Sequence, residues 1–480
     1  MFDHPHHLDP TDWTGFRRQS HQMLDDILDY VADIDQRPVW QPAPPEVRAE
    51  FQTSLPREPI SLADAHAKFM QLILPYSVGN AHPGFMGWVH GGGTVVGMLA
   101  EMLAAGVNAN LGGRNHIPIA VEQQVVRWMR DLFGFPEHAS GLLVTGSSLA
   151  NFIALLVARH QADGEIRARG LLNRSKMMTA CASAGTHGCL ARAMDMAGLG
   201  AEQLRRIPVD DHFRIDMKAL EQAIETDRRE GNMPFCVIGN AGTVDVGAID
   251  PLREIAALCR RERLWFHIDG AFGALAMMSP ALAPRFEGIE QADSLALDFH
   301  KWAQVQYDAG FVLVRDRDVH RAAFAAPAAY LSRESRGLAA GSTWPCDFGP
   351  DLSRSFKALK VWFTLQIYGD QQLGRMMEHT CELANELAKQ IREYDELELL
   401  APVALNIVCF RYRGPESDRL NSEIVIALQE SGRAAPSTTR INGDVAIRAA
   451  IFNHRTTTKQ LERLIEGVLA HGRRLQESKD

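Results

Sequence analysis

The chain has 480 residues, of which 46% are hydrophobic and 23% charged, with 38 Gly and 23 Pro that form no repeat. This composition excludes fibrous, collagen-like and wholly disordered proteins, and the length suggests two or three domains. The 59 acidic residues outnumber the 50 basic ones, and this net charge of -9 argues against a nucleic-acid partner, because such proteins concentrate Lys and Arg against phosphates.

The cysteines and the N-terminus predict a cytoplasmic protein. The 7 Cys are odd in number, scattered and free of Cys-x-x-Cys pairs, so we expect neither a disulfide framework nor a structural zinc site. Residues 1–13 lack the basic and apolar regions of a signal peptide. Residues 140–158 are uncharged and long enough to cross a bilayer, but Gly146, Ser147 and Ser148 interrupt them. A strand, a polar turn and a buried helix are therefore expected there, with no membrane partner.

The first predicted element is an amphipathic helix. Leu24, Ile27, Leu28 and Val31 repeat at the spacing that places them on one helix face. A proline-rich passage follows at residues 38–59. We interpret it as an arm that wraps another surface, such as a second subunit, with a plain linker as the alternative.

Residues 80–330 alternate short apolar runs with helical patterns. Strands are expected at Leu142–Thr145, Met177–Ser183, Phe235–Gly239, Leu264–Ile268, Ser294–Leu297 and Phe311–Val314. Helices are expected at Ala120–Leu132, Ala150–Arg159, Met217–Thr226 and Leu252–Arg261. This alternation predicts an α/β fold with a mostly parallel sheet that is covered on both faces. Such sheets bind ligands at the carboxyl ends of their strands, so the site is expected there.

A smaller α+β domain is predicted after the large one. Helical patterns at Phe356–Tyr368 and Met376–Tyr394 precede short strands at Asn406–Tyr412 and Val445–Ile451 and a final helix from about Lys459. The predicted division is an arm at 1–78, a large domain at 79–350 and a small domain at 351–480.

Two strand ends carry polar residues suited to an anionic cofactor. Gly146-Ser147-Ser148 lies between an apolar strand and an apolar helix, where free backbone N–H groups and the helix dipole suit a phosphate. Plain N-capping by serine is the alternative. Asp269 ends the strand 264–268, and a carboxylate buried there requires a cationic partner. The alternative for Asp269 is a turn or cap residue.

Lys301 follows the apolar strand 294–297, where burial is expected to lower its pKa and make the amine a nucleophile for carbonyls. A solvated surface lysine is the alternative. Together the phosphate turn, the buried Asp269 and Lys301 are what a pyridoxal phosphate site requires. Lysine forms the Schiff base, aspartate keeps the pyridine nitrogen protonated, and the turn anchors the phosphate. His187 follows another strand, where it is placed either to stack on the cofactor ring or to serve as a plain loop residue.

At these residues the chain resembles the group II pyridoxal-phosphate-dependent amino acid decarboxylases, which act on aromatic amino acids, glutamate or diaminobutyrate. His300-Lys301-Trp302 is similar to the family's Schiff-base motif, and the run 266–271 is similar to the strand that ends in the pyridine-binding Asp269. The run 147–151 resembles its phosphate turn, and Thr186-His187 its stacking histidine. The resemblance extends from about Phe16 to the final helix.

The resemblance implies the architecture called fold type I. This consists of an N-terminal arm, a large domain with a mostly parallel seven-stranded sheet, a small C-terminal domain, and a homodimer with its active site at the subunit interface. It implies cofactor contacts from Ser147, Ser148, His187, Asp269, Asp298, His300 and Lys301. Asp298 stands where the family often has an asparagine that helps to hold the phosphate. His300 is implied to assist catalysis.

The segment 324–331 is similar to the family's mobile catalytic loop. Tyr330 takes the position of the tyrosine that returns a proton to the substrate carbon after carbon dioxide leaves. Relatives that make aldehydes commonly lose this tyrosine, so Tyr330 favours simple decarboxylation to the amine.

The predicted substrate pocket comprises Trp88, Val89, His90, Asn110 and Arg114. The resemblance places 88–90 in the pocket-lining segment, and Asn110 and Arg114 in the segment that reaches the neighbouring subunit's pocket. Arg114 either pairs with a side-chain carboxylate or points into solvent. We favour an aromatic substrate, with an acidic or other polar amino acid (glutamate, aspartate or diaminobutyrate) as the alternative.

An alternative from another class is a metal-dependent hydrolase that uses His267, Asp269 and His300 as ligands. His-x-Asp at a strand end is a known way to present metal ligands. This hypothesis leaves Lys301 and the phosphate turn unexplained.

Overall fold

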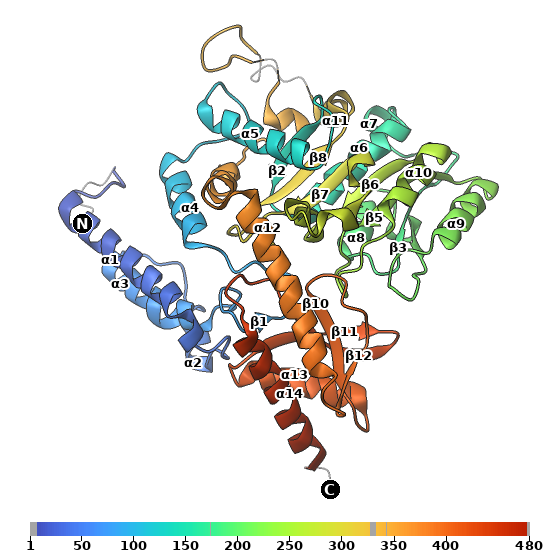
Figure 1. The fold of residues 1–480 in the computed structure, drawn as a ribbon. Coiled ribbons are helices and arrows are strands. Elements are labelled where there is room, and N and C mark those ends of the chain that lie inside the picture. Colours follow the sequence, from blue (N-terminus) through green and yellow to red (C-terminus); the bar gives the residue numbers. More distant parts are fainter. Residues whose placement is uncertain (1–6, 173, 327–332, 342, 478–480) are drawn as a thin grey trace.

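The chain forms an N-terminal helical segment, a large α/β part and a smaller C-terminal part (Figure 1). The computed structural model describes residues 7–172, 174–326, 333–341 and 343–477. No helix within these ranges combines the length and hydropathy that a bilayer crossing requires. The domain boundaries at residues 78 and 350 stay predictions.

The larger sheet has seven strands in the order β2-β8-β7-β6-β5-β3-β4. They are β2 (Ser140–Val144), β3 (Met178–Ser183), β4 (Leu204–Ile207), β5 (Met233–Asn240), β6 (Trp265–Asp269), β7 (Ser294–Asp298) and β8 (Gly310–Val314). Neighbouring strands run parallel, except that β8 is antiparallel to both β2 and β7. The central strands are almost wholly apolar because both of their faces are covered.

Two sets of helices cover the two faces of this sheet. One face carries α6 (Ser147–Ala162), α8 (Cys189–Met196) and α11 (Arg317–Phe324), with the short α7 (Ile166–Arg169) after α6. The other face carries α5 (Ile117–Leu132), α9 (Met217–Arg229) and α10 (Leu252–Glu262). The uncharged run 140–158 forms β2, a turn and most of α6, whose apolar face is fully buried, as the sequence predicts.

The smaller sheet has five strands in the order β1-β11-β12-β10-β9. They are β1 (Phe85–Met86), β9 (Leu397–Leu399), β10 (Ile407–Tyr412), β11 (Ala435–Ile441) and β12 (Asp444–Ala450). β1 runs parallel to β11, so a segment from early in the chain completes the C-terminal sheet. Helices α13 (Ser417–Glu430) and α14 (Thr458–Glu477) pack against this sheet.

One long helix, α12 (Lys357–Ile391), connects the two sheets (Figure 1). The two helices expected at 356–368 and 376–394 are therefore joined, with a break at Gly369, whose φ is 65°. The first half of α12 packs on α4 (Val95–Val107) and α5, and its second half packs on the small sheet.

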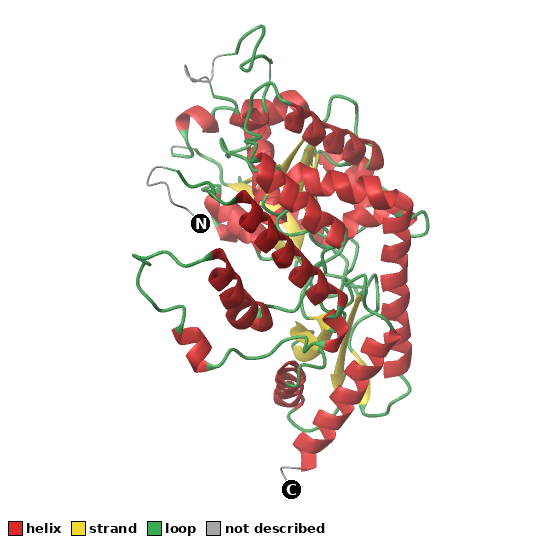
Figure 2. Ribbon diagram, turned by 90° about the vertical axis from the view of Figure 1, so that its left-hand side faces the viewer, coloured by secondary structure: helices red, strands yellow, loops and turns green. Residues whose placement is uncertain are grey.

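The N-terminal helices lie beside the rest of the chain (Figures 1 and 2). They are α1 (Trp13–Ala32), α2 (Pro45–Ala49) and α3 (Leu62–Lys68). Gly15 is the one buried residue of α1, and the predicted stripe of Leu24, Ile27, Leu28 and Val31 is only half-buried. The amphipathic helix is confirmed, but its apolar face is only partly covered within a single chain.

Candidate active site

The predicted cofactor residues gather around one cavity of about 470 Å³. It lies at the carboxyl ends of β2, β5, β6 and β7, where the parallel arrangement brings the strand ends together. Its lining includes Ser147, Ser148, His187, Asp269, Asp298, His300 and Lys301. All seven residues that the sequence nominated for the cofactor therefore share one cavity.

The turn from β2 into α6 leaves N–H groups at the start of the helix without helical partners. Ser147 donates its backbone N–H (2.6 Å) and its hydroxyl (2.7 Å) to the carboxylate of Asp298. Ser148 is exposed on the cavity side. The turn also passes close to β8, because a Cβ on Gly310 would lie 2.4 Å from the Cα of Gly146. Asp298 and Gly310 thus fix the conformation of the turn.

Lys301 is largely buried, and its Nζ lies 2.8 Å from Oδ2 of Asp298. Burial by itself lowers the pKa of Lys301, but Asp298 and Asp269 outweigh it and hold the pKa above the ordinary value. The expectation of a lowered lysine pKa was wrong for the chain alone, since the sequence named Asp269 and Asp298 as site residues but did not show that both face the amine. The negative charges of these two carboxylates favour the protonated form of the Lys301 amine.

Asp269 is buried at the end of β6, and its Oδ1 accepts a hydrogen bond of 3.1 Å from the N–H of Ala271. Burial raises the pKa of Asp269, while the charge of Lys301 acts in the opposite direction. Lys301 is therefore the cationic partner that the sequence analysis expected for a buried Asp269.

Below Asp269, His267 is fully buried and forms hydrogen bonds through both ring nitrogens. Its Nε2 lies 2.7 Å from Oδ1 of Asn151, and its Nδ1 lies 2.9 Å from the Ser294 hydroxyl. Burial lowers the pKa of His267 to about 3, so the ring is neutral. The metal-site alternative named His267, Asp269 and His300, but no group of three His, Cys, Asp or Glu in the described ranges is placed to hold an ion.

The two other predicted histidines differ in exposure. His187 is exposed to the cavity, and its Nδ1 accepts a hydrogen bond of 3.1 Å from the N–H of Cys189. His300 is buried, and its Nδ1 accepts a hydrogen bond of 3.0 Å from the N–H of Ala309. Burial lowers the pKa of His300 to about 4, so this ring is also neutral.

The predicted substrate residues divide into two groups. Trp88, Val89 and His90 line the cavity. Asn110 and Arg114 do not line it: the Asn110 amide oxygen accepts from the N–H groups of Gly112 and Arg354, and the Arg114 guanidinium lies over the Trp344 ring at 4.7 Å.

Tyr330, the predicted proton donor, lies outside the described residues.

Tyr307 and Arg448 are among the residues that line the cavity and that sequence reasoning missed. Arg448 projects from β12 and donates to the backbone oxygens of Asp245 (3.1 Å), Gly87 (3.0 Å) and Val244 (2.6 Å). An arginine in the otherwise apolar run 445–451 was the available signal. Tyr307 packs on His300 with ring centroids 4.2 Å apart, and nothing in the sequence marked it.

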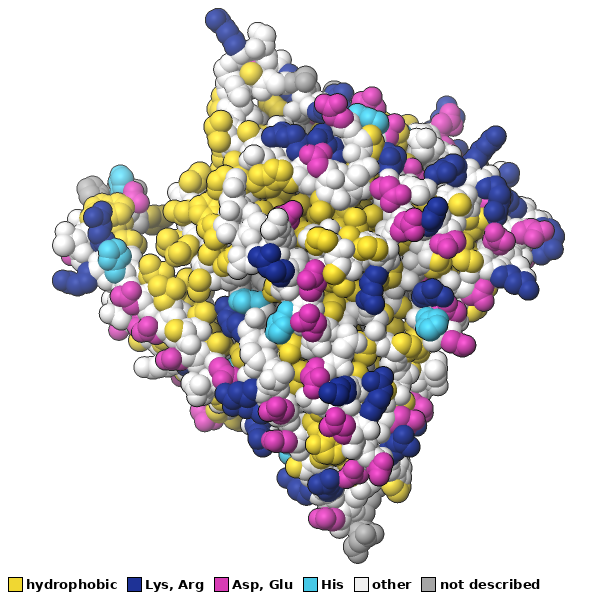
Figure 3. All heavy atoms as spheres, in the orientation of Figure 1, with side chains coloured by type: hydrophobic (Ala, Val, Ile, Leu, Met, Phe, Trp, Pro, Cys, Tyr) yellow, Lys and Arg dark blue, Asp and Glu magenta, His cyan; other side chains and the backbone are white. Residues whose placement is uncertain are grey.

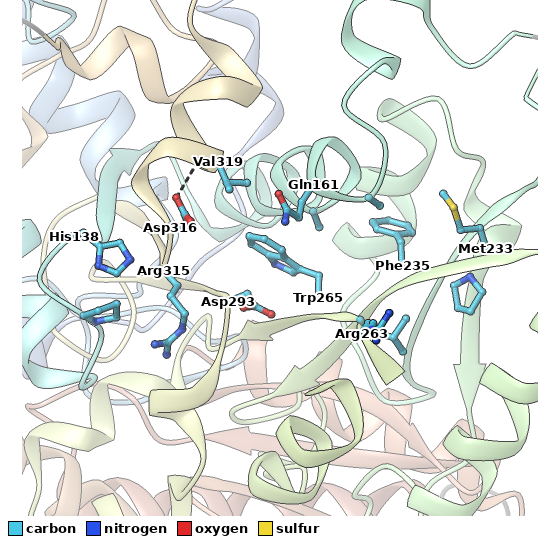
Figure 4. A pocket seen from close by; sticks show the side chains of 15 residues that line it. His138, Gln161, Met233, Phe235, Arg263, Trp265, Asp293, Arg315, Asp316 and Val319 are labelled. Atoms are coloured by element: carbon cyan, nitrogen blue, oxygen red, sulfur yellow. Dashed lines mark hydrogen bonds between the residues drawn. The ribbon is translucent and has the colours of Figure 1, made fainter. Parts of the chain in front are cut away.

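A larger hollow of about 700 Å³ lies at the opposite, amino end of the sheet (Figure 4). Trp265, Asp293 and Arg315 are among the residues that line it. Asp293 accepts from the backbone N–H of Phe266, and Arg315 donates to the backbone oxygen of Ala292. Because these charges serve the fold and no predicted site residue reaches the hollow, the smaller cavity is the candidate active site.

Comparison with known proteins shows the family of this chain. The family model described as "Pyridoxal-dependent decarboxylase conserved domain" matches residues 44–413. An aromatic-L-amino-acid decarboxylase of Bacillus atrophaeus is 33% identical over 95% of both chains. This chain belongs to the pyridoxal-dependent decarboxylase family. Its cofactor is pyridoxal 5'-phosphate, and it is an amino acid decarboxylase.

Further relatives of this decarboxylase include tyrosine decarboxylase 2 of Narcissus pseudonarcissus, 28% identical over 92% of this chain and 91% of the relative. Among solved structures, Oryza sativa TDC with PLP and tryptamine has a TM-score of 0.89 at 21% identity, covering 98% and 100% of the two chains. A glutamate decarboxylase domain from Vibrio parahaemolyticus has a TM-score of 0.85 at 24% identity, covering 97% of both chains. These likenesses confirm the predicted fold class, an α/β fold with the mostly parallel seven-stranded sheet of fold type I.

Proposed function

We propose that this decarboxylase converts an aromatic L-amino acid into the corresponding amine and carbon dioxide. The observation that carries the proposal is the convergence of Lys301, Asp269 and the phosphate turn on one cavity that also contains Trp88 and Tyr307. Its relatives from Bacillus, Narcissus and rice are described as decarboxylases of aromatic amino acids, tyrosine and tryptophan, which supports the same substrate class.

The donor set around the cavity fits pyridoxal phosphate. Ser148 and the start of α6 offer hydroxyl and N–H groups to a phosphate, and Lys301 is the amine that attaches the cofactor. Asp269 is the anion for the pyridine nitrogen, and His187 is exposed where it can lie against the ring. When bound, the cofactor supplies an electron sink for the electron pair that the departing carboxylate leaves behind.

Other side chains at the cavity orient the backbone and set the charge of Lys301. Asp298 is an acceptor, so in this chain it orders the turn through Ser147 and retains a proton on Nζ of Lys301 instead of binding phosphate directly. The neutral His300 holds the backbone of Ala309 and supports Tyr307. Proton return to the substrate carbon is assigned to Tyr330 by the resemblance alone.

An acidic substrate requires a cation that is free to pair with its second carboxylate. Arg448 and Lys301 are the Arg and Lys side chains that line the cavity in the described part of the chain. Arg448 is held by three backbone oxygens, and Lys301 by Asp298. This arrangement favours an aromatic side chain over glutamate or aspartate.

A homodimer is part of the proposal. The α4 helix exposes Val95, Met102, Leu103 and Val107, and hydrophobic side chains gather between the N-terminal helices and the body (Figure 3). Apolar surface of this extent on a helix, together with the half-buried stripe of α1, supports burial against a second copy. Asn110 and Arg114 follow α4 and would lie near the neighbouring pocket, with Arg114 stacked on Trp344 and not free to pair with a carboxylate. A cytoplasmic location stays a prediction.

The test is a product assay with a panel of L-amino acids labelled at the carboxyl carbon. We expect labelled carbon dioxide and an equimolar amine from at least one of tyrosine, tryptophan and phenylalanine, and none from the cofactor-free protein. Release from glutamate or aspartate alone would overturn the substrate assignment, and ammonia without carbon dioxide would overturn the reaction.

A further inference from the structure

Two polar rings, His90 and Tyr307, meet at the wall of the cavity that holds Lys301. Their ring centroids are 5.6 Å apart, with an edge-to-face angle of 76°. Phe85 and Trp88 pack around His90, at 5.7 and 6.1 Å between ring centroids. His90 and Tyr307 therefore place polar atoms on a side of the cavity that is otherwise lined by aromatic rings.

The position of His90 is fixed relative to the cofactor lysine. The next residue, Gly91, donates its backbone N–H to the oxygen of His300 at 3.1 Å. A Cβ on Gly91 would lie 2.3 Å from the backbone oxygen of Lys301, so the two segments are in direct backbone contact. His90 and the reacting centre thus belong to one rigid unit.

The polar atoms of the pair are available to a ligand. In the described ranges, neither ring nitrogen of His90 and no Tyr307 hydroxyl takes part in a hydrogen bond within the chain. Burial, with a further contribution from Lys301, lowers the pKa of His90. The neutral imidazole has one donor and one acceptor nitrogen, and the tyrosine hydroxyl both donates and accepts.

Resting on the proposed function, we propose that His90 and Tyr307 select aromatic L-amino acids that carry a hydrogen-bond donor on the ring over L-phenylalanine. The donors of this class are a phenol hydroxyl and an indole N–H, and the acceptors are a ring nitrogen of His90 and the oxygen of Tyr307. Bound phenylalanine covers these acceptors without offering them a donor, so they lose water and gain no hydrogen bond in return, which penalises its binding.

The mutational test compares kcat/KM for L-tyrosine, L-tryptophan and L-phenylalanine in His90→Leu, His90→Gln and the unmodified holoenzyme. In His90→Leu, the preference for tyrosine or tryptophan over phenylalanine is expected to fall roughly tenfold, about the net contribution of one hydrogen bond. His90→Gln keeps an acceptor and is expected to retain most of the preference. His138→Leu, which removes an exposed histidine at the far end of the sheet, is the matched control and leaves the ratio unchanged.

A preference that survives His90→Leu within twofold would overturn the inference, as would an equal loss for all three substrates. The tyrosine and tryptophan arms show which donor the pocket accepts.

A second measurement needs no variant. If the pocket accepts a phenol, kcat/KM of the unmodified enzyme is expected to be higher for L-tyrosine than for L-phenylalanine or for L-4-methoxyphenylalanine, which keeps the oxygen but lacks the donor. If it accepts an indole, kcat/KM is expected to be higher for L-tryptophan than for L-phenylalanine. Preference for phenylalanine over both tyrosine and tryptophan would overturn the inference while leaving the proposed function intact. Failure to release carbon dioxide from any aromatic amino acid would instead overturn the proposed function.

Discussion

The contact between Gly91 and the lysine loop leads to a quantitative prediction for Gly91→Ala. The added Cβ would lie 2.3 Å from the backbone oxygen of Lys301 and 2.7 Å from that of His300, whereas ordinary contact begins at 3.4 Å. Both neighbours are backbone atoms, so no rotamer change relieves the overlap. The segment that carries Lys301 must shift by about 1 Å, and displacements of that size at a reacting centre cost about 100-fold in rate.

The assay is carbon dioxide release by the cofactor-saturated enzyme, with thermal unfolding measured in parallel. We expect kcat to fall about 100-fold in Gly91→Ala, with a loss of about 1–3 kcal/mol in stability from overpacking. Gly164→Ala is the matched control, because its Cβ meets nothing closer than 3.8 Å. A Gly91→Ala enzyme with kcat within twofold of the unmodified protein would refute the argument that this contact positions Lys301.

Three further predictions concern buried charges. In Asp298→Asn, burial is no longer offset by the nearest carboxylate, so the pKa of Lys301 falls and cofactor uptake by the cofactor-free protein, followed by absorbance, extends to lower pH. Asp269→Asn is expected to keep the cofactor attached but to lose about 10²–10³ in kcat, because the pyridine nitrogen would no longer be held protonated and the cofactor would be a weaker electron sink. Arg354→Met leaves Glu122 buried and unpaired, which costs about 3–5 kcal/mol in the free energy of unfolding measured with urea.

The Asp298→Asn and Arg354→Met variants have matched controls at exposed residues. Asp318→Asn removes an exposed carboxylate and leaves the pH dependence of uptake unchanged, and an unchanged profile in Asp298→Asn would contradict the charge argument. Full activity in Asp269→Asn would remove that residue from the mechanism. Arg419→Met breaks an exposed pair with Glu416 and costs less than about 1 kcal/mol. A similarly small cost for Arg354→Met would show that its pairing with Glu122 does not stabilise the fold.

The sequence predicted the strands that carry the site because their signals are local. All six strands expected between residues 142 and 314 are present, and Asp269 and Lys301 follow two of them where the carboxyl ends meet. β4 and β11 were missed for physical reasons. Two arginines stand within the four residues of β4, an edge strand, and β11 begins Ala-Pro-Ser-Thr-Thr, which lacks the apolar alternation of a half-buried strand.

What the sequence did not predict depends on contacts between distant segments. β1 has only two residues and joins a sheet formed more than three hundred positions later, so no local pattern marks it. The raised pKa of Lys301 depends on Asp298, whose own position depends on Ser147 across the cavity. The pairing of His90 with Tyr307 likewise exists only once the fold brings their segments together.

The most direct test of the account is to locate the cofactor on the chain. The purified protein is incubated with pyridoxal phosphate, reduced with borohydride, digested and mapped by mass spectrometry. The account predicts a yellow absorbance that reduction bleaches, with a single reduced pyridoxyl label on Lys301, and no label at that peptide in Lys301→Ala. A label on a different lysine, or a protein that takes up no cofactor at all, would contradict it.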